Sequence, residues 1–238
     1  MILRRIATAF RRQDWFTVLI EMLIVIFGVY LGLIFNDVRE TRDRAHAAQE
    51  SLLLLLDDLE GDINRIELVR SRQQVRIDAF TVAIAELAKQ TPSYELIAEK
   101  LAVGVAHNQT LYARDTIYDV MEADGLLVAI PDELKEMIRT IYGSYLPMLA
   151  EAGLQLDQNT YAIDAQCFDV YWDRELKRPI SEEPTDLRRL SNCFVNMRDT
   201  SQIYSHGPDG ERLAKFYHLR DALREELGVT TTNEQVTQ

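Results

Sequence analysis

The feature that most constrains this chain is an apolar run at residues 15–35, WFTVLIEMLIVIFGVYLGLIF, in which Glu21 is the single charged residue. About 20 helical residues are enough to cross the ~30 Å hydrocarbon core of a bilayer. Aromatic residues stand near both ends of the run, where they favour the membrane interface. The run therefore predicts one transmembrane helix, over residues 15–36, with the lipid bilayer as a partner.

A cleaved signal peptide is the competing interpretation of this run. Such a peptide has a shorter apolar stretch that is followed directly by a small-residue cleavage site. Here the polar residues 36–40 (NDVRE) follow, and the first A-x-A pattern, at residues 45–47, lies further downstream. We therefore expect the span to stay in the mature protein.

The charges beside the span predict its orientation. Residues 1–14 carry four arginines and one aspartate, whereas residues 37–44 carry three arginines interleaved with three acids. Positive charge is retained on the cytoplasmic side of a membrane. We expect residues 1–14 to be a basic cytoplasmic N-terminus. In a bacterium the chain would then lie in the inner (cell) membrane with its C-terminal domain in the periplasm.

The rest of the chain is strongly acidic. Residues 37–238 hold 22 basic and 36 acidic side chains, a net charge of −14, and the basic N-terminal part brings the whole chain to −12. A domain of this charge is repelled by nucleic acid, so we exclude a nucleic-acid partner. Residues 37–227 are enough for one extracytoplasmic domain with its own core. Residues 228–238 are predicted to form a polar tail.

The spacing of apolar residues after the span predicts an all-α domain. Residues 37–51 contain no proline or glycine, so the transmembrane helix is expected to continue out of the membrane into a helical bundle. A 4-3-4-3 spacing then predicts the buried seam of a helix packed on other helices. Arg70 and Gln73 interrupt the seam, which disfavours one uninterrupted coiled coil. The seam residues are Leu52, Leu56, Leu59, Ile63 and Ile66, then Ile77, Phe80, Ile84 and Leu87.

Prolines and glycines divide the remaining sequence into further helices. Thr91-Pro92-Ser93 ends the first helix, Gly125 is a suitable C-cap, and Pro131 suits a helix start. A kink or break is expected at Gly143 and Pro147. No strand is expected. The predicted helices span residues 93–103, 114–124, 131–177, 186–205 and 208–227, with loops at 104–111 and 178–185.

Two stretches carry a resemblance to a known family. They are EMLIVIFGVYLGLIFN, at residues 21–36, and YDVMEADGLLVAIPDELKEMIRTIY, at residues 118–142. Together they resemble a bacterial family of single-pass inner-membrane proteins that is catalogued as a domain of unknown function. The resemblance implies an inner-membrane location and a helical domain, and it implies no activity. The matching positions are Glu21, Gly28, Asn36, Tyr118, Gly125, Leu134, Ile138 and Tyr142.

The chain has two cysteines, Cys167 and Cys193, each beside a phenylalanine on a predicted amphipathic helix. The two helices are joined by a short loop, so an antiparallel hairpin could bring the thiols together. An oxidising compartment permits a disulfide. Two buried free thiols are the alternative, because free cysteines are among the most buried residues.

Inside the span, small and polar residues fall on one side of the helix. At about 100° per residue, Gly28 and Gly32 each lie roughly 20° from Glu21, and Asn36 lies about 60° away. Gly28 and Gly32 form a GxxxG spacing, which lets two helix backbones approach closely. The stripe is therefore a candidate face for a partner helix, with Glu21 protonated or paired there. In the alternative interpretation Glu21 snorkels to an arginine such as Arg12.

No catalytic or cofactor motif stands out. His46, His107, His206 and His218 lack metal-ligand spacing, and the sequence has no C-x-x-C, Walker or G-x-S-x-G motif. We expect no metal, no cofactor and no enzyme. Asn108-Gln109-Thr110 matches the acceptor pattern for N-glycosylation, and we interpret this match as chance. Tyrosines at helical spacings are interpreted as core residues: Tyr112, Tyr118, Tyr142, Tyr145, Tyr161 and Tyr171.

These features favour a membrane-anchored helical interaction or scaffold protein. It would self-associate as a homo-oligomer or bind another membrane or periplasmic protein, because a cytoplasmic part of about 14 residues is too short to fold. A proton- or ion-coupled membrane subunit that uses Glu21 is the alternative, since stator and energy-transducing proteins have a similar layout. A ligand-binding sensor domain is a third hypothesis.

Overall fold

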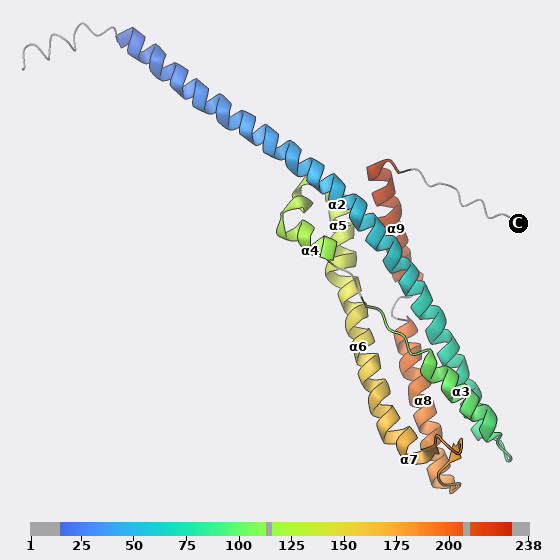
Figure 1. Ribbon diagram of the computed structural model, residues 1–238. Coiled ribbons are helices and arrows are strands. Elements are labelled where there is room, and N and C mark those ends of the chain that lie inside the picture. Colours follow the sequence, from blue (N-terminus) through green and yellow to red (C-terminus); the bar gives the residue numbers. More distant parts are fainter. Residues whose placement is uncertain (1–14, 113–115, 207–209, 230–238) are drawn as a thin grey trace, which may run out of the picture.

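A computed structural model describes residues 15–112, 116–206 and 210–229 of the chain, and it is all-α as expected. A long N-terminal helix runs the length of a helical bundle (Figure 1). The α-helices are α2 (Trp15–Leu87), α3 (Tyr94–Ala106), α4 (Thr116–Ala123), α5 (Asp132–Thr140), α6 (Leu146–Ile163), α7 (Asp169–Tyr171), α8 (Pro184–His206) and α9 (Gly210–Leu227). The shorter elements are the 3₁₀ turn η1 (Leu126–Ala129), the π-helical turns η2 (Ile141–Tyr145) and η3 (Asp164–Phe168), and the strands β1 (Trp172–Asp173) and β2 (Arg178–Pro179).

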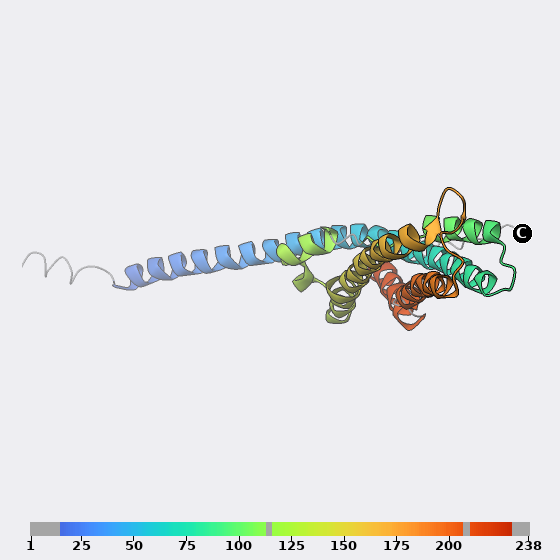
Figure 2. The same ribbon diagram turned by 90° about the horizontal axis from the view of Figure 1, so that it is seen from below.

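Helix α2 is the spine of the molecule. Its 73 residues extend for about 110 Å at the standard helical rise. The N-terminal half projects alone, and the bundle gathers around the other half (Figure 2). The seam predicted from its spacing is buried, apart from Ile84, which is partly buried. The polar side chains at Arg70 and Gln73 leave the helix unbroken, so the expected span does continue into the bundle.

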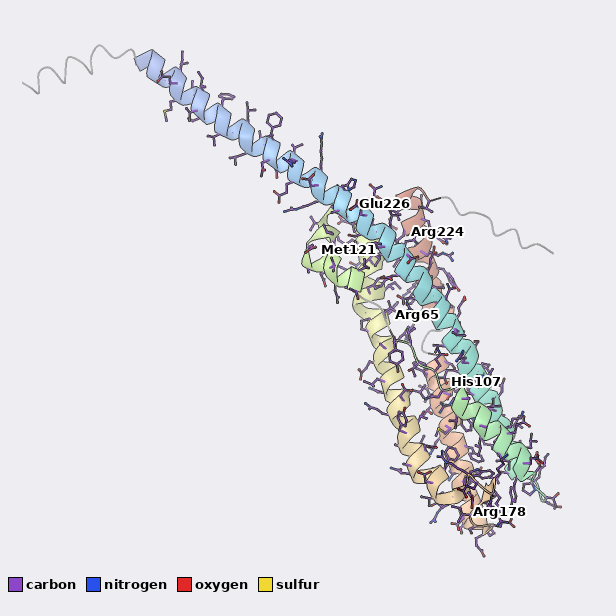
Figure 3. The ribbon with its side chains drawn as sticks, viewed as in Figure 1. Arg65, His107, Met121, Arg178, Arg224 and Glu226 are labelled. Carbon is purple, nitrogen blue, oxygen red and sulfur yellow. A yellow bond between two sulfur atoms is a disulfide. The ribbon has the colours of Figure 1, made fainter. Side chains whose placement is uncertain are left out.

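Among the described residues the bundle core has two large apolar parts, and a small cluster of Val69, Leu156 and Tyr204 forms a third. The part nearer the free half of α2 is built from α2, α4, η1, α5, α6 and α9, and Leu55, Leu59, Ile138 and Phe216 are fully buried there. The distal part joins α2, α3, η3 and α8 around Phe80, Phe168 and Phe194. Arg224 of α9 (Figure 3) also donates to Glu60 of α2 at 2.7 Å.

The expected kink at Gly143 and Pro147 takes the form of a wider turn. Residues 132–171 stay helical, and the π-helical turn η2 connects α5 to α6. Pro147 lacks the N–H that the α-helical pattern requires, and a π turn is one way in which a helix accommodates such a site. Gly143 lies within η2, where an added Cβ would come within 3.3 Å of the Tyr118 hydroxyl.

The largest departure from the expected structure is a small hairpin at residues 172–179. The helix ends at Tyr171 instead of Lys177, and β1 pairs with β2 in antiparallel register, Trp172 opposite Pro179. The Asp173 carboxylate accepts hydrogen bonds from the N–H groups of Glu175 and Leu176, at 2.9 and 2.8 Å. These bonds offer the backbone an alternative to the helix, and they turn the chain back.

Two other boundaries also bear on the packing. Gly125 ends α4 and has a φ of 67°, a left-handed conformation that favours glycine and agrees with its expected role. Helix α3 continues to Ala106, so the loop expected at residues 104–111 is shorter. Residue 104 lies against the ring of Phe80, where a side chain would not fit, so a glycine at this position lets the helix continue.

Candidate functional site

The free half of α2 is long and apolar enough to cross a membrane. An 18-residue window within it has a mean hydropathy of 2.2, and none of that window is buried against the protein. Large side chains from Leu19 to Val38 are instead exposed. A soluble surface rarely exposes a contiguous apolar area of this size. Lipid is the environment that such a surface fits.

The four residues singled out within the span, here called the membrane stripe, are Glu21, Gly28, Gly32 and Asn36. All four are exposed, and they lie on one continuous helix. A Cβ added at either glycine would meet nothing within 4 Å. Nothing in the described part of the chain packs against the two glycines, so this face of α2 is open to a partner from outside the chain.

A second exposed stripe lies on the part of α2 that carries the bundle. It consists of apolar residues at intervals of seven, and we call it the outer stripe. Its exposed fractions fall from 57% at Leu54 to 39% at Val82. The outer stripe does not stand out in the sequence, because only one of its residues recurs in each heptad, where a coiled-coil seam has two apolar residues. The outer stripe is Leu54, Leu68, Val75 and Val82, with the partly buried Gly61 in the same line.

The two stripes lie on the same side of one helix. Leu68 follows Gly32 by 36 residues, which is about ten turns at 3.6 residues per turn. Asn36 and Leu54 are similarly separated by about five turns, and Glu21 and Val75 by about fifteen. Because α2 is unbroken, these whole-turn separations place the membrane stripe and the outer stripe in line.

Ten residues, 37–46, connect the span to the bundle, and they project as a single helix. All are exposed, so tertiary packing gives them little support. Ion pairs along the helix surface join Arg44 to Glu40 at 2.6 Å and Arg39 to Asp43 at 3.7 Å. Pairs at this spacing stabilise an isolated helix by about 0.2–0.5 kcal/mol each. Because α2 is one unbroken helix here, the span and the bundle share one rotational register.

A partly buried cluster of polar side chains joins helices in the middle of the bundle. The Asp157 carboxylate accepts hydrogen bonds from the Asn108 amide and the Thr110 hydroxyl, both at 3.0 Å. The Tyr204 hydroxyl accepts from the Leu111 N–H at 2.8 Å, and the Gln73 amide donates to a backbone carbonyl at 2.7 Å. The segment that matches a glycosylation acceptor, residues 108–110, thus has a structural role, since the side-chain amide of Asn108 donates to Asp157.

Arg76 lies beside this polar cluster and is almost completely buried. Its guanidinium donates to the Thr160 hydroxyl at 3.1 Å and stands 5.6 Å from the centre of the Phe80 ring. Burial lowers the pKa of Arg76 to about 10, and the charge of Asp157 partly opposes that shift. Its Nε and Nη1 atoms have no hydrogen-bond partner among the described residues. The arrangement links α2 to α6 through Thr160, and to α8 through the Met197 sulfur, which lies 3.2 Å from the guanidinium.

The two cysteines are joined in a disulfide. Cys167, on η3, and Cys193, on α8, have Cα atoms 5.9 Å apart. The neighbouring rings of Phe168 and Phe194 stack with their centres 5.7 Å apart. The bond fixes the distal end of α6 and η3 to α8. Disulfides of this kind are typical of oxidising compartments, which favours an extracytoplasmic domain.

The described residues offer no site for a metal ion. They contain no group of three or more His, Cys, Asp or Glu side chains that could hold one. His46 lies 3.4 Å from Glu50, His107 contacts the Val103 carbonyl at 2.8 Å, and His218 is exposed. The side chain of His206 lies outside the described residues.

The tyrosines divide into two groups. Tyr118 and Tyr142 are buried and stack with their centres 5.7 Å apart, as the core interpretation predicted. Tyr145 and Tyr171 are partly buried. The interpretation is wrong for Tyr112 and Tyr161, which are exposed by 77% and 75%. Helical spacing places residues on one side of a helix, but it does not say whether another helix covers that side.

Fold and site together define an all-α protein with one candidate membrane span that continues as the spine of a disulfide-linked bundle. No family model, curated protein or solved structure matches the chain.

Proposed function

We propose that this chain is a single-pass protein of the bacterial inner membrane that acts by binding and not by catalysis. Residues 1–14 lie in the cytoplasm and the helical domain lies in the periplasm. The unburied apolar half of α2 supports the span, the N-terminal arginines support the orientation, and the disulfide supports an oxidising compartment.

The proposed binding partner is a second copy of the same chain. The observation that carries this proposal is the alignment of the membrane stripe with the outer stripe on one unbroken helix. Two copies inserted in one membrane have parallel α2 helices, so the corresponding stripe residues of the two copies lie at the same height. A parallel pair related by a twofold axis then matches Gly28 with Gly28 and Leu68 with Leu68.

The two stripes favour association for different physical reasons. In lipid, Gly28 and Gly32 let two backbones come close enough for van der Waals packing to hold them together. Outside the membrane, burial of Leu54, Leu68 and Val75 removes apolar surface from water. Asp57, Asn64 and Asp78 lie beside the outer stripe, and their polarity keeps the outer contact weaker than a full coiled-coil seam.

The test is the molar mass of the purified full-length protein in mild detergent. The parent chain should run as a dimer, and Gly28→Ile with Gly32→Ile should make it a monomer. Leu68→Glu with Val75→Glu should weaken the dimer, because like charges then face each other. The matched control is Gln74→Glu with Thr81→Glu, which changes exposed positions about 100° around the helix from Val75 and Val82.

A substitution at Glu21 distinguishes two possible contacts of this side chain within the pair: a hydrogen bond from the protonated acid, and an ion pair of the carboxylate. Glu21→Gln should keep the dimer if the acid donates a proton across the interface, and should weaken it if the acid pairs with a cation. A parent chain that is monomeric, or an isoleucine variant that associates as the parent does, would mean that the membrane stripe faces lipid. Recovery of a different membrane protein in place of a second copy would also contradict the proposal.

A further inference from the structure

A cavity opens at the distal end of the bundle, far from the span. Its volume is about 370 Å³, and it lies between α3 and the segment that runs from η3 through the hairpin. His107, at the end of α3, and Arg178, on β2, mark the two sides of this region in Figure 3. The cavity is lined by Ala98, Leu101, Ala102, Val105, Ala106, Asp164, Phe168, Trp172, Arg174 and Lys177.

The interior of the cavity is apolar. Ala98, Ala102 and Ala106 follow one another at four-residue intervals, so their small side chains give α3 a flat wall. Phe168 and Trp172 form the opposite wall, and both are buried in the bundle. Pockets for small molecules have volumes of about 300–1,000 Å³ and combine such apolar walls with a few placed polar groups.

One basic side chain at the opening has no salt-bridge partner. Arg174 is bonded to Asp164 at 2.7 Å and lies 3.2 Å from Asp169, so both carboxylates are taken up by this one guanidinium. Lys177 lines the same cavity and has no carboxylate within salt-bridge distance among the described residues. An apolar cavity with one unpaired ammonium group at its opening is complementary to an apolar molecule that carries one carboxylate.

Three unusual features of the backbone surround the same cavity. Lys177 has a φ of 52°, the one positive φ among the described residues other than glycine. The π-helical turn η3 supplies Asp164 and Phe168, and the disulfide at Cys167 holds that turn against α8. Strained residues and π turns occur often at functional sites because the surrounding structure must hold them in place.

We propose that this cavity binds a small aliphatic monocarboxylate. The alkyl chain lies between α3 and the Phe168–Trp172 wall, and the carboxylate pairs with the Lys177 ammonium. Phe80 of α2 packs on Gly104 of α3, and Phe80 follows Asn36 by 44 residues, about 66 Å along the helix. A lipid held in the bilayer cannot reach so far, so the ligand comes from the solution around the domain.

The test uses octanoate as the probe and the full chain in lipid nanodiscs without detergent. The chain has two tryptophans, Trp15 and Trp172. Trp15→Phe therefore leaves Trp172 as the one emitter, inside the cavity. Octanoate should shift its emission saturably and release or absorb saturable heat, relative to empty nanodiscs. Octylammonium and octanol, which have the same chain, should bind more weakly.

Substitutions separate the two halves of the proposed contact. Lys177→Asn removes the charge and keeps a residue that tolerates the left-handed conformation, so the fold is retained. It should weaken octanoate binding by about two- to fivefold, as for an exposed charge pair, and leave octanol binding unchanged. Lys177→Arg should restore the preference for octanoate.

Bulk within the cavity provides the second comparison. Ala102→Phe should abolish octanoate binding, whereas Ala85→Phe, at an exposed position on α2 outside the cavity, should have no effect. The proposal is overturned if octanoate gives neither a saturable shift nor saturable heat. It is also overturned if octylammonium binds as well as octanoate, or if Ala102→Phe binds octanoate normally.

Discussion

The ring of Phe80 occupies the space that a side chain at Gly104 would need. A Cβ built on Gly104 would come within 2.8 Å of Phe80 Cζ and 2.9 Å of Cε2. Phe80 is fully buried and is held by Phe194, 6.5 Å away between ring centres, so it has little freedom to move. The absence of a side chain at Gly104 thus sets how closely α3 approaches α2.

Gly104→Ala should therefore destabilise the domain, although alanine is the better helix former. Overpacking costs about 1–3 kcal/mol, and the gain in helix propensity is about 1 kcal/mol. We expect the free energy of unfolding to fall by up to about 2 kcal/mol in chemical denaturation. Gly61→Ala is the matched control, because its Cβ would meet only Arg65 at 3.6 Å. It should stabilise the domain by about 0.5–1 kcal/mol, and equal effects of the two substitutions would contradict the packing described here.

Tyr142 should make the domain sensitive to alkali. Burial raises the pKa of Tyr142, and the nearby Asp62 and Asp58 raise it further. The folded state therefore keeps the phenolic proton when the unfolded state, with a pKa of about 10, has lost it. The stabilisation from this difference is complete below about pH 10, and it is lost progressively as the pH rises above that value.

Tyr142→Phe removes this dependence. The Tyr142 hydroxyl is buried with no hydrogen-bond partner among the described residues. Its removal should therefore raise the free energy of unfolding by about 1 kcal/mol at pH 7. Above pH 10 its advantage should grow by up to about 1.4 kcal/mol per pH unit. Tyr112→Phe, at an exposed position, should match the parent at both pH values. A parallel loss of stability in parent and Tyr142→Phe above pH 10 would assign the alkaline transition to other groups.

The disulfide should contribute measurably to the stability of the distal end. It closes a loop between residues 26 positions apart, for which the chain-entropy model gives about 3–4 kcal/mol. Cys167→Ser with Cys193→Ser should lower the free energy of unfolding by about 2–4 kcal/mol. Reductant should destabilise the parent by a similar amount and leave the double variant unchanged. If reductant has no effect on the parent, the two thiols are not bonded in the isolated protein.

The topology can be tested in cells. A reporter enzyme that is active only in the periplasm should be active when it is fused after Gln238, and the mature protein should keep its first 35 residues. Activity of a cytoplasm-only reporter at the same position would reverse the orientation. A mature N-terminus at residues 36–48 would instead identify a secreted domain.

Local patterns predicted much of this fold. The spacing from Leu52 to Leu87 predicted the buried face of α2, and Gly125 predicted the end of α4, because both signals act within one helix. The hairpin was missed because it depends on how the Asp173 side chain turns a stretch whose composition also suits a helix. Arg70 and Gln73 were interpreted as an interruption, yet Gln73 is buried against a backbone carbonyl 36 residues away.

The candidate sites divide in the same way. The membrane stripe follows from helical geometry alone, so Glu21, Gly28, Gly32 and Asn36 could be grouped without a structure. The outer stripe needed the knowledge that no other described helix covers Leu54 and Leu68. The distal cavity brings α3 together with the hairpin, about 70 residues later in the chain, and no periodicity in the sequence predicts that contact.

The most direct test of a self-associating spine is disulfide crosslinking in native membranes. The described residues contain no free cysteine, so a single added cysteine supplies a new thiol. Leu68→Cys and Val75→Cys should each form a covalent dimer on mild oxidation, because both lie on the outer stripe. Gln74→Cys and Thr81→Cys, exposed about 100° around α2 from Val75 and Val82, should stay monomeric. Equal crosslinking at all four positions, or crosslinking at Gln74 and Thr81 alone, would contradict a pair that meets along the membrane stripe and the outer stripe.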